Sequence, residues 1–180
     1  MRRNTALFEW ILLSLLAALM FALKFAMAPL PNIEPVSLLI IVYTLVFGRK
    51  ALYAVYLYVG LEVLFFGFGL WNFAYLYVWA ILFLLTRIFR NMHSRVGFAV
   101  LSGAFGLVFG LLCMPVFMAA GGVSYGLSSY VSGIPFDVMH CVGNFAIALI
   151  LQEPLTKLLR RLRLRYLPEE APKKETGENT

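Results

Sequence analysis

The sequence predicts an all-α integral membrane protein, a bundle of six transmembrane helices with both termini in the cytoplasm. The chain has 180 residues, of which 62% are hydrophobic and 13% charged, whereas soluble domains average about 45–50% and about 25%. A soluble fold of this length has too little interior for so many apolar side chains. The apolar runs are continuous rather than alternating, which indicates helices and excludes an outer-membrane barrel.

Each expected helix is an apolar run bounded by glycine, proline or basic residues. A span needs about 20 mostly apolar residues, and the second run is short by that measure. Residues 1–155 are expected to form one membrane domain. Its helices are predicted at 6–28, 34–47, 51–68, 72–89, 96–120 and 135–155.

Positive charge alternates from one connection to the next. The connections at 29–33, 67–71 and 121–134 contain no lysine or arginine, whereas the termini and the other connections contain all of them except Lys24 and Arg87, which lies near the end of the predicted helix 72–89. Basic loops remain in the cytoplasm, so both termini are expected there. The net charge of +6 is therefore interpreted as a topology signal and not as a nucleic-acid surface. Residues 156–180 are predicted to be a basic cytoplasmic end with a disordered tail.

Small residues recur at every fourth position of the first helix, where they let another helix approach closely. Two interpretations stay open, packing inside the bundle and docking of a partner subunit. A second stripe, at Ser102, Gly106 and Gly110, is interpreted mainly as internal packing. The first stripe consists of Ser14, Ala18, Ala22 and Ala26.

Several ionisable residues are expected at membrane depth, near one level on the external side. Each costs about 2.5–3.5 kcal/mol on insertion scales, so such residues usually face a cavity or a partner. They are the strongest functional signal in the chain. The set consists of Lys24, Glu34, Glu62, Asp137 and His140.

The sixth helix places Asp137, His140 and Asn144 on one face, at positions i, i+3 and i+7. Pro135 suits the first turn of this helix, and Asp137 near its N-terminus suits the helix dipole. The face is interpreted as the wall of a solvent-accessible cavity, with a hydrogen-bonded clamp as the alternative. One histidine among scattered carboxylates is a weak ligand set, so no metal site is expected.

Aromatic residues crowd the same external side. They form either an interfacial belt or a surface that stacks on a flat heteroaromatic ligand. Catalysis is not expected, because the chain has no HExxH, GxSxG or Walker lysine motif. The same lack means that ATP hydrolysis would fall to partner subunits. Candidate ligand residues from this region are Trp71, Asn72, Tyr75 and Tyr125.

Over residues 6–155 the chain resembles the substrate-binding S components of energy-coupling-factor (ECF) transporters, the bacterial vitamin importers. The resemblance rests on the six spans, the alanines at 18, 22 and 26, the external polar cluster and the entry to the second helix at 31–37 (PNIEPVS). It implies that Ala18, Ala22 and Ala26 dock onto a membrane coupling subunit, that two ATPase subunits complete the transporter, and that an external pocket holds the ligand.

The expected function is capture of a vitamin-like, heteroaromatic molecule without chemistry, and no cofactor is expected. One lysine among three carboxylates favours a neutral or cationic ligand. The resemblance implies that the S component tilts to release it. Two alternatives stay open. One is an MreD-like scaffolding protein, which would have an apolar external side. The other is an intramembrane enzyme that uses Asp137 and His140, for which the sequence offers no paired nucleophile.

Overall fold

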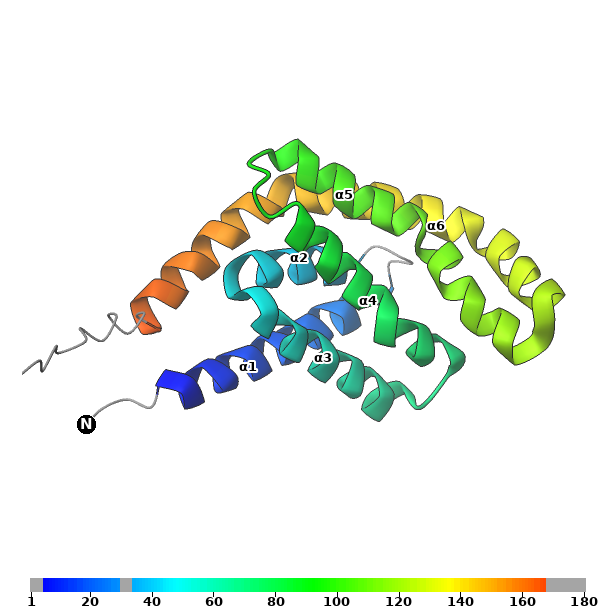
Figure 1. The fold of residues 1–180 in the computed structure, drawn as a ribbon, viewed down its shortest axis with the longest axis horizontal. Helices are drawn as coiled ribbons and strands as arrows, with labels where there is room; N and C mark the ends of the chain where they lie inside the picture. Colours follow the sequence, from blue (N-terminus) through cyan, green and yellow to red (C-terminus); the bar gives the residue numbers. More distant parts are fainter. Residues whose placement is uncertain (1–4, 30–33, 168–180) are drawn as a thin grey trace, which may run out of the picture.

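A computed structural model describes residues 5–29 and 34–167, and all regular structure in these ranges is helical (Figure 1). The predicted disordered tail at 168–180 and residues 31–33 of the PNIEPVS segment lie outside the described residues. The elements are α1 (Thr5–Ala26), α2 (Val36–Phe47), the 3-10 helix η1 (Gly48–Lys50), α3 (Ala51–Phe66), α4 (Leu70–Ile88), α5 (Arg95–Leu107) and α6 (Phe109–Tyr166).

Within α6 the chain reverses at a single residue, Gly122, whose φ of 85° and ψ of 174° are not helical. Glycine adopts such a positive φ without a steric penalty. Figure 1 shows residues 109–121 leading away from α5 and residues 123–166 returning beside it. These two parts are the first arm and the second arm of α6.

The prediction of a non-helical connection at 121–134 is wrong, because all of these residues except Gly122 are helical. Its small residues serve close packing: a Cβ on Gly126 would lie 2.2 Å from the Met118 side chain of the first arm. The predicted helix at 135–155 is likewise too short, since the second arm begins directly after Gly122 and ends at Tyr166. Pro135 lies inside this helix and not in its first turn. The predicted helix at 96–120 is interrupted at Val108.

Four helical segments among the described residues are long and apolar enough to cross a membrane. Val36–Phe66 contains α2 and α3, which meet at Gly48, and Arg95–Tyr166 contains α5 with both arms of α6. The other two segments are Leu7–Ala26 and Leu70–Ile88. Many large apolar side chains on these helices are exposed, including Leu64 and Ile88. This combination is typical of a protein whose solvent is largely lipid.

The core surrounds α2, which contacts α1, α3, α4, α5 and α6. All its residues except Leu45 are buried. A helix that is apolar all round is expected at such a central position. The buried Tyr43 hydroxyl donates a hydrogen bond to the Leu16 carbonyl at 3.1 Å.

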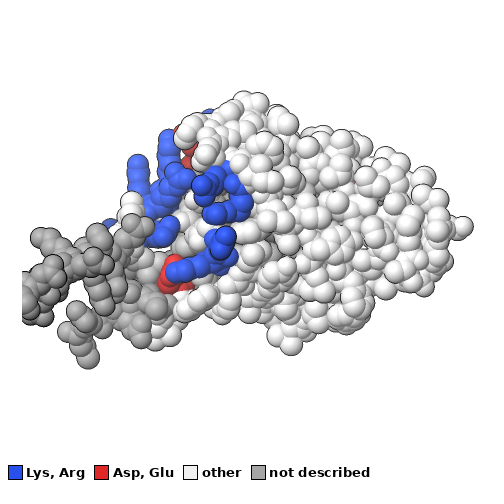
Figure 2. Space-filling model, viewed as in Figure 1, with Lys and Arg blue, Asp and Glu red and all other residues white. Residues whose placement is uncertain are grey.

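Lysines and arginines gather at one end of the molecule (Figure 2), and α1 begins and α6 ends at that same end (Figure 1). This region is called the basic end. Lys50 pairs there with Glu9, and Arg95 pairs with Glu153. Lys24, on the C-terminal part of α1, lies away from it and pairs elsewhere.

Candidate ligand-binding site

An ion cluster joins α1 to α3 and to Glu34, two residues before α2. Lys24 Nζ lies 2.7 Å from Glu62 Oε2 and 3.9 Å from Glu34 Oε2. The same ammonium lies 5.2 Å from the centre of the Tyr75 ring and 5.8 Å from that of Tyr58, within cation–π range. The three predicted charges therefore meet, and Lys24 points into the bundle.

The ion cluster holds one cation and two carboxyl groups. Glu62 is only 3% exposed, and its Oε1 atom has no hydrogen-bond partner. Burial raises the pKa of the Glu34 carboxyl above its ordinary value, and the nearby Lys24 ammonium offsets part of this increase. Through Glu62 Oε1 the cluster can accept a hydrogen bond from a ligand.

A pocket of about 500 Å³ opens between α4 and the two arms of α6. This volume lies within the range of about 300–1,000 Å³ that is common for small-molecule sites. Tyr75 belongs to both the pocket and the ion cluster, so the two are contiguous. The pocket is lined by Trp71, Tyr75, Phe109, Gly110, Cys113, Phe117, Ser129, Gly133, Phe136 and Asp137.

Asp137 caps a helix other than its own. Its two carboxylate oxygens accept hydrogen bonds from the Gly110 N–H, at 3.0 and 3.1 Å. Gly110 lies in the first turn of the first arm, whose N-cap residue Val108 supplies no side-chain cap. The expectation that Asp137 stands at the N-terminus of its own helix is wrong. Its carboxylate nevertheless lies at the positive end of a helix dipole, that of the neighbouring first arm.

His140 and Asn144 follow Asp137 along one buried face of the second arm, as the spacing predicts. The His140 ring lies edge-on to Phe109 with centroids 5.0 Å apart, and its Nε2 has no hydrogen-bond partner. The Asn144 amide donates to Ser37 Oγ at 3.0 Å and to the Ser102 carbonyl at 3.3 Å. The polar face thus combines both interpretations: Asn144 clamps α6 to α2 and α5, whereas Asp137 lines the pocket.

The other three candidates are placed differently. Trp71 lines the pocket and is half exposed. Asn72 is buried beside it and accepts a hydrogen bond from the Gly69 N–H at 2.7 Å, which stabilises the turn before α4. Tyr125 packs on Phe117, with ring centroids 5.8 Å apart, and does not line the pocket. Tyr125 is therefore not brought to the site.

Sequence analysis missed Tyr58, Trp79 and Phe109. Phe109 lies between the rings of Tyr75, Trp79 and His140 at centroid distances of 6.3, 5.4 and 5.0 Å. A signal for the first two was present, because Tyr58 precedes Glu62 by four residues and Trp79 follows Tyr75 by four. Residues at that spacing share a helix face. Phe109 carries no signal that separates it from other apolar residues.

Buried polar atoms without a hydrogen-bond partner are concentrated around this region. Such atoms are rare in folded proteins and each calls for an explanation. Here they are contributed by α3, α4, α5 and α6 and are both donors and acceptors. The atoms are Tyr58 OH, Glu62 Oε1, Asn72 Nδ2, Trp79 Nε1, Ser102 Oγ, His140 Nε2 and Asn144 Oδ1.

The two small-residue stripes have different environments. Ala18, Ala22 and Ala26 are exposed on the outer face of α1. Ser14, at the start of this stripe, donates to the Trp10 carbonyl at 2.9 Å and lies 3.2 Å from the Tyr53 hydroxyl. In the second stripe, Ser102 and Gly106 lie on α5 and pack inside the bundle, where a Cβ on Gly106 would lie 2.8 Å from the His140 backbone. Gly110 lies beyond the interruption at Val108, on the first arm of α6.

Within residues 5–29 and 34–167, no three His, Cys, Asp or Glu side chains are grouped so that they could hold a metal ion. Comparison of the chain with protein-family models, with curated proteins and with solved structures finds no match. The pocket, the ion cluster and the exposed alanines are therefore the features on which a functional proposal rests.

Proposed function

We propose that this protein is the substrate-binding S subunit of an ECF-type importer in a bacterial plasma membrane, and that it captures a vitamin-like, heteroaromatic molecule. The observation that carries the proposal is the 500 Å³ pocket, whose lining combines the rings of Trp71, Tyr75 and Phe109 with the Asp137 carboxylate. Aromatic walls with a few convergent polar groups are typical of small-molecule sites.

Binding would proceed by stacking and polar recognition, without a chemical step. The rings of Trp71, Tyr75 and Phe109 would stack on the flat part of the ligand. Asp137 and the unpaired Glu62 Oε1 would accept hydrogen bonds from its polar edge. Since the Lys24 ammonium is already engaged by Glu62, the carboxylates favour a neutral or cationic ligand over an anion.

The proposed topology has six spans with the basic end in the cytoplasm. The spans would be α1, α2, α3, α4, α5 with the first arm of α6, and the second arm. Positively charged segments remain on the cytoplasmic side, and the lysines and arginines gather at the end where α1 begins and α6 ends (Figures 1 and 2). The ion cluster and the pocket would then lie toward the outside.

Transport would require partners. The exposed alanines of α1 offer a smooth face on which a membrane coupling subunit could pack closely. Two ABC ATPase subunits would supply ATP hydrolysis, because the chain has no Walker lysine motif. In this proposal the S subunit tilts to release its ligand into the cell.

The test is native mass spectrometry of the gently purified protein, followed by thermal shift across a panel of vitamins. We expect a heteroaromatic molecule bound one to one. Asp137→Asn and Glu62→Gln should each weaken its binding about tenfold or more, since each removes a charged hydrogen-bond acceptor. The matched control is Glu153→Gln, which neutralises a carboxylate at the basic end and should leave binding unchanged.

An MreD-like scaffold makes the opposite forecast. It predicts a protein that purifies without a small molecule and melts at one temperature across the whole panel. That outcome would overturn the importer proposal. Unchanged affinity in both Asp137→Asn and Glu62→Gln, with binding intact, would instead refute the assignment of the site.

A further inference from the structure

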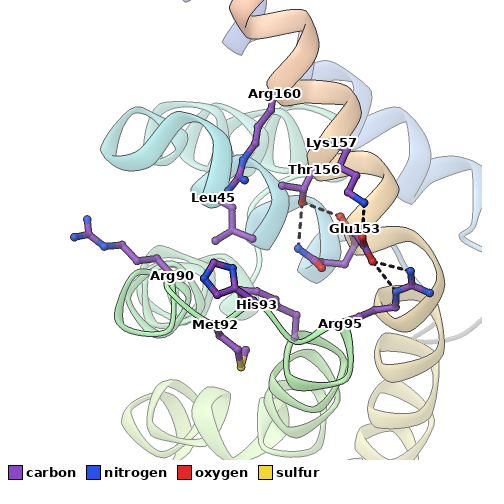
Figure 3. A pocket seen from close by; sticks show the side chains of 11 residues that line it. Leu45, Arg90, Met92, His93, Arg95, Glu153, Thr156, Lys157 and Arg160 are labelled. Atoms are coloured by element: carbon purple, nitrogen blue, oxygen red, sulfur yellow. Dashed lines mark hydrogen bonds and ion pairs between the residues drawn. The ribbon is translucent and has the colours of Figure 1, made fainter.

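Two adjoining cavities at the basic end form one groove between α2, α4 and the C-terminal part of α6. Their volumes are about 210 and 410 Å³, and they share Leu45, Arg90 and Arg160. Figure 3 shows the first of them. We call the combined feature the basic groove. Its walls contain one carboxylate, Glu153, and six cationic side chains, those of Arg87, Arg90, Arg95, Lys157, Arg160 and Arg163.

Only half of these cations have a partner within the described chain. Arg95 and Lys157 both pair with Glu153, as the dashed lines in Figure 3 mark. Arg163 donates to the Val46 carbonyl at 2.6 Å. The other three arginines, Arg87, Arg90 and Arg160, form no hydrogen bond or ion pair among residues 5–29 and 34–167.

Unpaired guanidinium groups that face a common groove repel one another and favour an anion between them. Figure 3 shows Arg160 reaching from α6 toward Leu45, across from His93 and Arg90. A guanidinium group presents a planar set of donors that matches the oxygens of a phosphate. The groove therefore has the chemistry of a phosphate site.

The surface beside the groove is suited to acyl chains. Leu84 and Ile88 are 56% and 71% exposed. Arg87, which lines the groove, follows Leu84 by three residues and directly precedes Ile88, so the three side chains share one face of the last turns of α4. Along that face, an apolar strip leads directly into the cationic groove. A free phosphate would use the groove alone, whereas a phospholipid would use both.

We propose that the basic groove binds the phosphodiester headgroup of an anionic membrane phospholipid. Arg87, Arg90 and Arg160 contact the phosphate, and the acyl chains lie over Leu84 and Ile88. Basic pockets between membrane helices bind anionic headgroups in this way. The inference does not rest on the proposed transport function, because the groove lies at the end of the molecule away from the ion cluster.

The test titrates the purified full chain in detergent with phosphatidylglycerol and with phosphatidylcholine, and counts bound lipids by native mass spectrometry. Wild type should bind phosphatidylglycerol one to one in preference to phosphatidylcholine. Arg90→Gln with Arg160→Gln should weaken phosphatidylglycerol binding about 25-fold, from roughly fivefold per surface cation. The matched control is Arg161→Gln with Arg165→Gln, which removes equal charge outside the groove and should weaken binding less than about twofold.

Three results would overturn the proposal. One is equal binding of the two lipids by wild type, a result that does not depend on whether any variant folds. Another is an equal loss in the two double variants, which would indicate diffuse attraction by net charge. The third is displacement of phosphatidylglycerol by millimolar inorganic phosphate, which would make the groove a site for a free anion.

Discussion

The two stripes of small residues carry the same sequence pattern and have opposite environments. On α1, Ala18, Ala22 and Ala26 lie exposed on the outer surface. On α5, Gly106 packs so closely on the second arm of α6 that a Cβ there would lie 2.8 Å from the His140 backbone. Small residues therefore mark where a helix can be approached closely, and not whether the approaching helix belongs to the same chain.

The difference follows from what lies on the opposite face of each helix. The inner face of α1 carries Leu13, Met20 and Lys24, which already bind it to the bundle through apolar packing and the ion cluster. α5 has its closest association with α6, and its glycines form that contact. The α1 stripe is thus available to a second protein, whereas the α5 stripe is already packed against α6 inside the bundle.

The largest effect is expected where the buried stripe is filled. Gly106→Leu should lower the free energy of unfolding by about 3 kcal/mol, because the new side chain would clash with the His140 backbone, which cannot rotate away as a side chain can. Reversible unfolding in mixed detergent micelles measures this change. Ala22→Leu adds a similar side chain to the exposed stripe and should alter the free energy by less than about 0.5 kcal/mol. Similar losses in the two variants would contradict the contrast between the stripes.

An intermediate effect is expected at Gly110, the last position of the second stripe, which lies on the first arm of α6 and lines the pocket. A Cβ there would lie 2.5 Å from Asp137 Oδ2, so Gly110→Ala should turn the carboxylate away and remove its cap on the first arm. The expected loss is about 1–2 kcal/mol of unfolding free energy. Asp137→Ala removes the same cap, so the double variant should lose less than the sum of the single losses. Strict additivity would show that the two residues act independently.

The smallest effect on stability, with a large effect on assembly, is expected on the exposed stripe. Ala22→Trp should leave the melting temperature nearly unchanged and prevent co-purification with a coupling subunit, because the bulky ring blocks close helix approach. Ala146→Trp is the matched control, since it places the same ring on an exposed position of α6. If both variants co-purify as wild type does, the α1 stripe is not a docking face.

Much of the fold could be predicted from hydropathy. The predicted helices at 51–68 and 72–89 lie close to the observed α3 and α4, because single glycines or a charged turn bound each apolar run. The connection at 121–134 could not be predicted, since its glycine-rich composition is typical of a loop. Packing of Gly126 against Met118 decides in favour of helix, and that contact depends on the reversal at Gly122.

The candidate site was predictable in outline. The sequence predicts Lys24 and Glu62 at one depth, and the packing of α1 against α3 brings them to 2.7 Å from each other. Tyr125 was misplaced because its assignment assumed a loop near the sixth helix, whereas it lies on a helix and packs on Phe117. Phe109 was missed because a pocket wall made by one phenylalanine among many has no local signature.

By itself the sequence determined the apolar character of this protein and the positions of its charges along the chain, because hydropathy and charge are properties of each residue alone. Only the tertiary structure decided which small-residue stripe is exposed, which helix Asp137 caps and where the pocket opens. These features depend on contacts between residues far apart in the chain, such as Gly110 with Asp137, and packing of that kind is not additive along a sequence.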